Sequence, residues 1–234
     1  MRSLTRARDV RGRLVEHRWD WAERNADLIG ANWARRTAAT PRIFDGRVLM
    51  SVGREPFADV AEPRFFVTNY AAMLAWIDAG CPDESVANAF AMGAIRCRDG
   101  AFLLGEMAPG TANAGRLYFP CGTPDMTDVT GAGEVDLAGS LEREIAEETG
   151  LPRDSLDVEH GWTIVRADGL LAFIRLVTLD RDAEDARGII LRSIQAQAEP
   201  ELVDIHIVRT SACLEASRMP AVVPIFLVDA FQRT

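Results

Sequence analysis

One stretch of this sequence, residues 136–149, constrains the fold more than any other. Its apolar side chains Leu137, Leu141 and Ile145 recur every four residues, which is the spacing of a buried stripe on an α-helix. The stretch begins with an aspartate, which suits the N-cap position, and Gly150 follows it, which suits the C′ position. The pattern therefore predicts an amphipathic helix over residues 136–149 whose apolar stripe packs on another layer.

The same helix gathers three carboxylates. Glu144, Glu147 and Glu148 are spaced i, i+3 and i+4, so they share one face, away from the apolar stripe. Like charges at this spacing destabilise an exposed helix by about 0.2–0.5 kcal/mol per pair, and the last turn of a helix disfavours anions. A divalent cation would turn the repulsion into coordination, and Mg²⁺ fits because it binds a few carboxylates and keeps water and phosphate as its other ligands. We therefore predict a magnesium site, with Mn²⁺ as the alternative, and expect Arg143 to hold a carboxylate in place.

Strand patterns on both sides of this helix predict a mixed sheet between helices, that is, an α/β fold. Two hairpins are expected, each around an Asp-Gly turn, which is the strongest short-range hairpin signal. The first covers residues 88–107 and the second residues 160–179. The other expected elements are a strand at 116–120, a helix at about 183–198, a strand at 202–209 and a helix at 222–231.

The first 86 residues have a different pattern. Apolar residues at helical spacing predict one helical segment over residues 4–39, with the six arginines of the first 18 residues on its solvated face. A strand at 47–52 follows, and residues 65–79 are expected to form a strand end and a helix. We predict a small α+β accessory region at 1–86 and a second domain at 87–234. The four tryptophans of the accessory region are expected to pack its interior: Trp19, Trp21, Trp33 and Trp76.

The charge balance excludes some classes of protein. The chain has 26 basic residues, all arginine, and 35 acidic residues, so its net charge is −9. This acidity argues against nucleic acid as a partner, because binding to phosphate backbones needs clustered cations. Residues 123–160 contain 11 acidic and two basic residues, and this difference accounts for the whole excess. The acidity of the chain is therefore concentrated around the predicted metal-binding helix.

The cysteines and the apolar segments indicate in which cellular compartment the protein is expected. The four cysteines are widely separated, with no CxxC pair, so we expect reduced thiols instead of a zinc site or a redox motif. The Arg-rich N-terminus lacks the apolar core of a signal peptide, and the apolar run at 222–230 is shorter than the ~20 residues that span a bilayer. A cytoplasmic protein with no membrane partner is expected.

Residues 143–151 resemble the second half of the Nudix box, whose pattern is Arg-Glu-apolar-x-Glu-Glu-x-Gly-apolar. All seven specified positions match, and residues 119–122, Phe-Pro-Cys-Gly, look like the Pro-Gly-Gly that commonly opens the loop of this family. The resemblance covers residues 88 to about 232. The first half of the box departs from the pattern, because its Glu position falls on Val135 and its Gly position on Val129.

The resemblance implies a Nudix-like α/β/α sandwich with a mixed sheet that hydrolyses a nucleoside diphosphate linked to another moiety, a pyrophosphatase acting on an acid anhydride. It implies metal ligation by Glu144, Glu147 and Glu148, and catalytic roles for Glu147, Glu148 and Arg143. Glu134 or Asp136 could substitute for the missing loop carboxylate. The general base of this family is a glutamate of the box or of a later loop, and the later candidates are Glu199 and Glu201, for which a solvated loop is the alternative.

Substrate contacts are expected from the loop at 108–116, which is rich in small and polar residues. Thr111, Asn113 and Arg116 could face the substrate, and the Arg116 guanidinium suits bidentate binding of phosphate. The alternative is an ordinary connecting loop. The leading hypothesis is thus a Mg²⁺-dependent hydrolase whose accessory region shapes the pocket or a homodimer interface, and the alternative is a Nudix-fold binding module without turnover.

Overall fold

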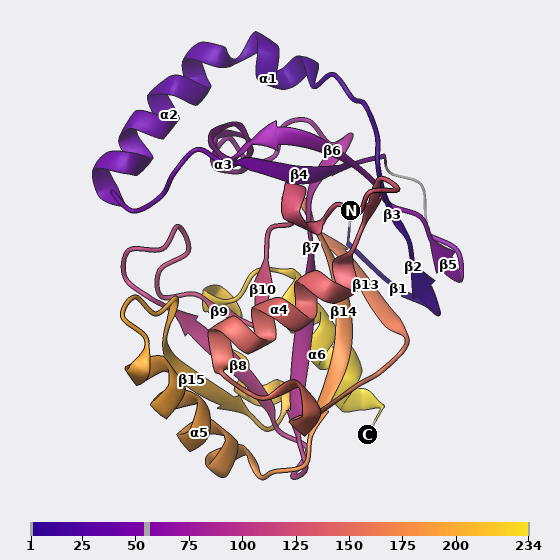
Figure 1. Ribbon diagram of the computed structural model, residues 1–234, viewed down its shortest axis with the longest axis vertical. Helices are drawn as coiled ribbons and strands as arrows, with labels where there is room; N and C mark the ends of the chain where they lie inside the picture. The colour runs from indigo at the N-terminus through magenta and orange to yellow at the C-terminus, as the bar shows by residue number, and fades with distance from the viewer. Residues whose placement is uncertain (1, 54–56, 234) are drawn as a thin grey trace.

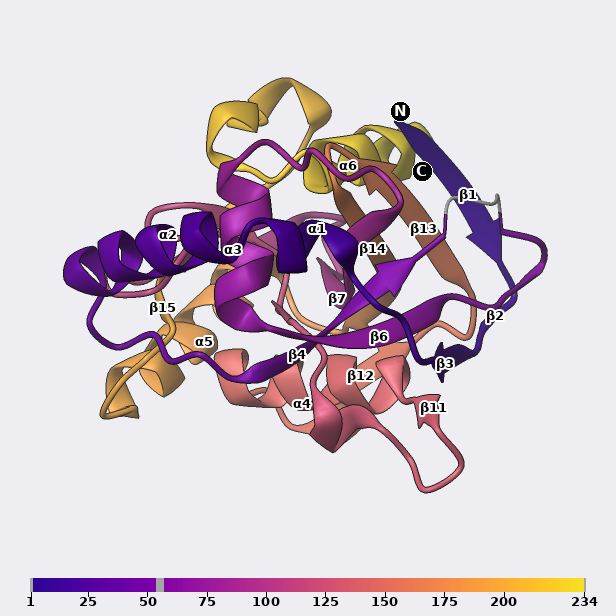
Figure 2. The ribbon, with the colours of Figure 1, turned by 90° about the horizontal axis from the view of Figure 1, so that it is seen from above.

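The computed structural model describes residues 2–53 and 57–233. They form a mixed α/β structure in which a curled sheet carries helices on both faces (Figures 1 and 2), so the predicted fold class is confirmed. At the centre of the sheet, β7 (Val86–Cys97) and β14 (Leu170–Leu179) run parallel to each other. The two predicted hairpins are present and join β7 to β8 (Phe102–Met107) and β13 (Trp162–Ala167) to β14.

Helices α4 (Leu137–Thr149) and α5 (Ala183–Ala196) cover one face of the sheet, and α6 (Val222–Gln232) covers the other. The α4 helix has the predicted bounds. The Asp136 side chain accepts a hydrogen bond of 2.8 Å from the Gly139 N–H, and Gly150 adopts the left-handed conformation, with φ +67°. The side chain of Ile145 lies over Gly93 of β7, where an added methyl group would overlap it. Close packing at this glycine fixes the helix on the sheet.

The predicted helix over residues 4–39 is wrong in its first half. That part forms three short strands, β1 (Ser3–Ala7), β2 (Asp9–Val10) and β3 (Gly12–Leu14), and only then α1 (Asp20–Arg24) and α2 (Ala26–Ala39). Residues 3–7 are extended and not helical because β1 pairs with β13 at the edge of the sheet. Its arginines are therefore not on a helix face. Two of the arginines of the N-terminal segment pair with distant aspartates: Arg2 forms an ion pair with Asp168 at 2.8 Å, and Arg6 forms one with Asp229.

The rest of the N-terminal region follows the prediction. It contains β4 (Arg47–Val52), β6 (Arg64–Asn69) and α3 (Tyr70–Asp78), and α3 is followed by Gly80 with φ +81°. Trp19 and Trp76 are buried in a core of their own, and the Trp33 ring packs edge-on against Tyr70. Because β1 pairs with β13 and β3 pairs with β11 (Glu134–Val135), this region is hydrogen-bonded to the rest of the chain. A division into two domains near residue 86 stays a prediction.

The remaining elements are short or lie at the sheet edges. The strands are β5 (Val60–Ala61), β9 (Leu117–Tyr118), β10 (Cys121–Gly122), β12 (Leu156–Val158) and β15 (Leu202–Val208). The strand expected at 116–120 is thus only two residues long, and β10 pairs with β7 just after it. Across residues 2–53 and 57–233, no helix is long and apolar enough to cross a membrane.

Candidate functional site

Two of the three predicted metal ligands lie against the short strand β10. Glu148 is buried, with 6% of its surface exposed, and its carboxylate accepts a hydrogen bond from the backbone N–H of Cys121. A methyl group added at Gly122 would overlap the carboxylate of Glu144, so this carboxylate lies directly against the strand. Glu147 is exposed. The glutamate face of α4 therefore packs on β10 at Glu144 and Glu148 and is open at Glu147.

The surroundings of the α4 glutamates disfavour the ionised forms of Glu144 and Glu148. Burial, followed by the nearby Glu147 and Glu201 carboxylates, raises the pKa of Glu144 to about 7. Burial and the neighbouring glutamates also raise the pKa of Glu148 above its ordinary value. Among the residues that the structure describes, no arginine or histidine forms an ion pair with Glu144, Glu147 or Glu148. When they are ionised, these side chains repel one another, and the charge of Arg143 offsets only part of that repulsion at Glu144.

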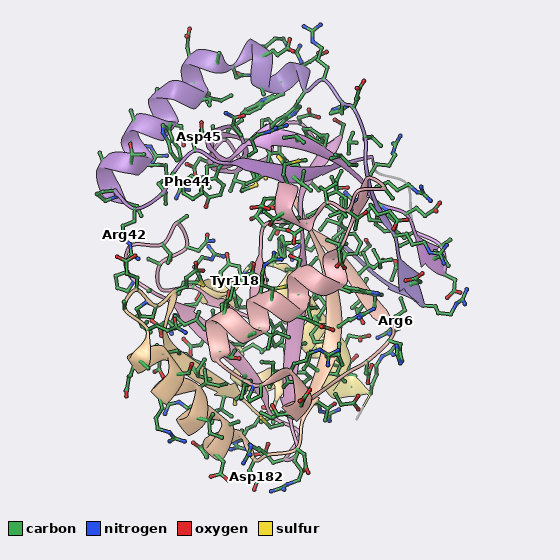
Figure 3. The ribbon with its side chains drawn as sticks, viewed as in Figure 1. Arg6, Arg42, Phe44, Asp45, Tyr118 and Asp182 are labelled. Carbon is green, nitrogen blue, oxygen red and sulfur yellow. The ribbon has the colours of Figure 1, made fainter. Side chains whose placement is uncertain are left out.

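The structure distinguishes the two candidate bases of the later loop. Glu201 is exposed, and its charge contributes to the raised pKa of both Glu144 and Glu148, so it belongs to the same cluster. Glu199 instead accepts a hydrogen bond of 2.7 Å from Arg42, which lies where the N-terminal region meets the loops of the other half of the molecule (Figure 3). Only Glu201 shares the electrostatic environment of the α4 glutamates.

The chemistry of these donors fits a hard divalent cation such as Mg²⁺. All of them are carboxylates, and a cation would favour the charged forms of Glu144 and Glu148, whose pKa values are raised by burial and by the neighbouring carboxylates. Within the described parts of the chain, no three His, Cys, Asp or Glu side chains are already arranged to hold a metal ion. Binding of an ion would therefore require a change of rotamer, for which the exposed Glu147 and Glu201 are free.

Arg143 pairs with a carboxylate, as expected, and the partner is Asp128. The guanidinium donates a hydrogen bond of 2.7 Å to Asp128, which is buried, with 4% of its surface exposed. The other carboxylate oxygen of Asp128 accepts from the backbone N–H of Asp125 and closes a capping box on the turn at residues 126–128. The pairing of Asp128 with Arg143 was not predicted, although the spacing of Asp125 and Asp128 is that of a capping box.

Asp136 and Glu134, the two candidates to replace the missing loop carboxylate, are engaged as a helix cap and exposed on a strand, respectively. Asp136 is engaged as the N-cap of α4, and Glu134 is exposed on β11, opposite Arg13 of β3. Val135, at the Glu position of the box, is buried in the core. The buried carboxylate that this loop contributes is that of Asp128.

A cavity of about 960 Å³ lies beside β10. Cys121 and Gly122 line it, together with Asn113 and Arg116 of the predicted substrate loop. Thr111 does not line it, and its hydroxyl donates to the carbonyl of Ala108 within the loop.

Helix α3 of the N-terminal region connects the cavity with the acidic cluster. Tyr70 of α3 lines the cavity, and its pKa is raised by burial and by the charge of Glu201. Arg36 of α2 also lines the cavity and is paired with Asp78. The acidic cluster and the cavity are therefore neighbours, and the N-terminal region forms part of the cavity wall.

No family model matches this sequence, and no curated protein matches it. Solved structures do match. The MutT protein from Methanosarcina mazei Go1 is 18% identical over 63% of this chain and 94% of that chain, with a TM-score of 0.39. An Ap4A hydrolase from C. elegans is 15% identical over 63% of this chain and 96% of that chain, with a TM-score of 0.41. Tm1382, described provisionally as a Nudix hydrolase, is 14% identical over 80% of this chain and 100% of that chain, with a TM-score of 0.44. Similarity at this level does not assign a family, an activity or a substrate to this chain.

Proposed function

We propose that this protein hydrolyses the diphosphate linkage of a nucleoside diphosphate derivative, with Mg²⁺, or alternatively Mn²⁺, held by Glu144, Glu147 and Glu148. The observation that carries the proposal is the packing of the α4 glutamates against β10, directly beside a cavity of about 960 Å³. The residues of α4 that face this strand are those that match the Nudix pattern.

The residues of the cluster have distinct roles in this proposal. A bound divalent cation lowers the pKa of a coordinated water and neutralises charge on the diphosphate. Glu201 is exposed beside the cluster and is our proposed general base, since it can accept the proton of the attacking water. Arg143 is a positioning residue, because its bond to Asp128 ties α4 to the preceding loop.

Arg116 is the proposed phosphate-binding residue on the cavity side. Its guanidinium donates one hydrogen bond of 3.0 Å to the carbonyl of Met219, and no carboxylate within the described residues forms an ion pair with it. The remaining N–H groups can therefore bind phosphate oxygens. Asn113 lies in the same wall and can donate from its amide. Thr111 is proposed to contribute to substrate binding only by shaping the loop that carries Asn113 and Arg116, because its own hydroxyl donates a hydrogen bond to the carbonyl of Ala108.

The experiment that tests the proposal is a hydrolysis panel with purified protein. It contains nucleotide sugars, ADP-ribose, NADH, dinucleoside polyphosphates and acyl-CoA, each with Mg²⁺, with Mn²⁺ and with EDTA. Cleavage of at least one compound at its diphosphate, dependent on the cation, supports the proposal. If every compound stays intact with both cations, the hydrolase proposal fails.

The alternative function is a binding module that retains the glutamate helix without turnover. The observation that favours it is the departure of the loop from the Nudix pattern, with buried Val135 at the Glu position. Binding of a panel compound with no cleavage would support this alternative. In either case we propose a small-molecule partner, not nucleic acid or a membrane surface, together with a cytoplasmic location and a possible homodimer.

A further inference from the structure

Two apolar helices form opposite walls of the cavity beside β10. The residues of the first wall belong to α3, in the N-terminal region, and those of the second belong to α6 and the residue before it. They are Met73, Leu74 and Ile77 on α3, and Ala221, Pro224, Ile225 and Val228 at α6. Phe90 of β7 and Leu170 of β14 lie between them. These elements therefore give the cavity a largely apolar lining, beside which Asn88 and the paired Arg2 and Asp168 also line it.

Helix α6 is apolar on nearly every side, which is unusual for a helix that is not fully buried. Its inner face, including Phe226 and Leu227, is buried on the sheet. Its cavity face is less covered: Ile225 is half-buried, and Val228 is 40% exposed. Apolar side chains left open beside a cavity are typical of a ligand-binding surface.

Among the charged residues of the lining, Arg116 forms no ion pair with any described residue. Arg116 lies in the wall that also contains Cys121 and Gly122, next to the acidic cluster. The other two arginines of the lining are engaged: Arg2 forms an ion pair with Asp168, and Arg36 forms one with Asp78. The cavity thus has an anion-binding end near β10 and an aliphatic end between α3 and α6.

We propose that the aliphatic end binds the hydrocarbon chain of the substrate, so that the moiety linked to the diphosphate is an acyl, alkyl or isoprenoid-like chain. This inference rests on the proposed function, and it adds the chemical class of the second moiety. The volume of about 960 Å³ is within the range of about 300–1,000 Å³ that small-molecule pockets occupy. Unbranched thioether side chains such as Met73 and Met219 adapt to a flexible chain.

A nucleobase is a less suitable occupant of this end. Bases are held by stacking on aromatic rings and by hydrogen bonds to their edges. The ring of Tyr70 already packs against Trp33, and Phe90 belongs to the hydrophobic core. Most side chains that α3 and α6 contribute to the lining are aliphatic and offer no donors or acceptors to a base, and the polar lining residues near them are Asn88 of β7 and the paired Arg2 and Asp168.

Binding can be tested without turnover. Calorimetry in EDTA with the full chain would use dodecyl phosphate below its micelle concentration, adenosine 5′-monophosphate and inorganic phosphate as separate ligands. We expect dodecyl phosphate to bind at least tenfold more tightly than either of the other two. Equal or tighter binding of adenosine 5′-monophosphate would overturn the inference, as would no binding of dodecyl phosphate.

Variants of the two walls locate the binding site. Ile77→Asn and Ile225→Asn each place a neutral amide in one wall, and each is expected to weaken binding of dodecyl phosphate about tenfold, since an apolar contact with the hydrocarbon chain is lost. Leu28→Asn is the matched control, because Leu28 is 42% exposed on α2 and does not line the cavity. Val228→Asn, at an exposed position, replaces any wall variant that fails to fold. Unchanged binding in folded wall variants would overturn the inference.

The outcome separates this inference from the proposed function. If dodecyl phosphate binds and the wall variants weaken it, but no diphosphate in the panel is cleaved, the chain-binding cavity stands and the hydrolase proposal fails. If a diphosphate is cleaved but dodecyl phosphate does not bind, the hydrolase proposal stands and the aliphatic class of substrate is wrong.

Discussion

The two sides of β10 differ in charge and in origin. On the α4 side, Glu144 and Glu148 lie against the strand, and neither forms an ion pair with an arginine among the described residues. On the cavity side, Arg116 and two further arginines line a space whose walls come from α3 and α6. The difference indicates a division of roles: the helix that matches the Nudix pattern provides the proposed chemistry, and elements outside that pattern provide the proposed specificity. Changes on the α4 side should therefore lower kcat, and changes on the cavity side should raise KM.

The largest effect is expected from Glu148→Gln on the α4 side. The amide keeps the shape of the side chain but removes its charge, so we expect kcat to fall at least about 100-fold, because metal-assisted steps lose a charged ligand. The matched control is Glu142→Gln on the same helix, since Glu142 forms a surface ion pair with Arg153 at 2.8 Å. Steady-state kinetics of both variants check this. Similar rates for wild type and Glu148→Gln would remove this residue from the site.

Asp128→Asn should reduce stability on the α4 side. Asp128 is buried and holds Arg143, so the variant loses a charge-assisted hydrogen bond and leaves part of the guanidinium unpaired. We expect a loss of about 1–3 kcal/mol in the free energy of unfolding, measured by urea denaturation. Asp99→Asn is the control, because Asp99 pairs with the half-exposed Arg209 at the surface, where ion pairs contribute about 0–1 kcal/mol. Equal losses in the two variants would contradict the role of Asp128.

Gly122→Ala tests the strand between the two sides. The added methyl group would overlap the carboxylate of Glu144, so that side chain must move away from β10. We expect kcat to fall about tenfold, since a misplacement of about 1 Å in a catalytic group can cost up to ~100-fold. Gly131→Ala is the control, because no atom lies within 4 Å of a methyl group added there. An unchanged kcat in Gly122→Ala, measured in the same assay, would mean that the position of Glu144 against the strand is not needed.

The sequence predicted the α4 side better than the cavity side, for a physical reason. The bounds of α4 depend on local signals, namely an apolar stripe, an N-cap aspartate and a C-terminal glycine, and all of them lie within residues 136–150. The cavity depends on where the sheet places α3 and α6, which are far apart in sequence, so no local pattern indicates it. The extended conformation of β1 was missed for the same reason, because it depends on pairing with β13.

Within the candidate site, the three α4 glutamates could be predicted because their spacing puts them on one helix face. The burial of Glu148 and the exposure of Glu147 could not be predicted, because they depend on where β10 lies relative to the helix. The same holds for the pairing of Arg143 with Asp128, which connects residues on two elements. Roles that depend on one element can be inferred from sequence, whereas roles that depend on packing between elements need the structure.

The smallest effect expected is a difference in pH dependence between the two sides, in EDTA. Burial and neighbouring carboxylates raise the pKa values of Glu144 and Glu148, so the folded state binds more protons than the unfolded state as pH rises from about 4.5 to about 7. Their contribution to stability therefore declines across this window. Asp78 behaves oppositely: burial opposes its ionisation, but hydrogen bonds from Arg36 and Asn32 lower its pKa overall. Its stabilising contribution is present above about pH 4 and is lost as the pH falls further.

Urea denaturation at several pH values, with two variants, checks both signs. Glu148→Gln should flatten the decline between about pH 4.5 and 7, because one of the two groups with a raised pKa is gone. Asp78→Asn should leave that decline unchanged and reduce the loss of stability in acid. Adding Mg²⁺ to the wild type should restore stability near pH 7, because a ligand that binds only the folded state stabilises it. A decline that persists in Glu148→Gln and is unaffected by Mg²⁺ would mean that the repulsion lies elsewhere in the chain.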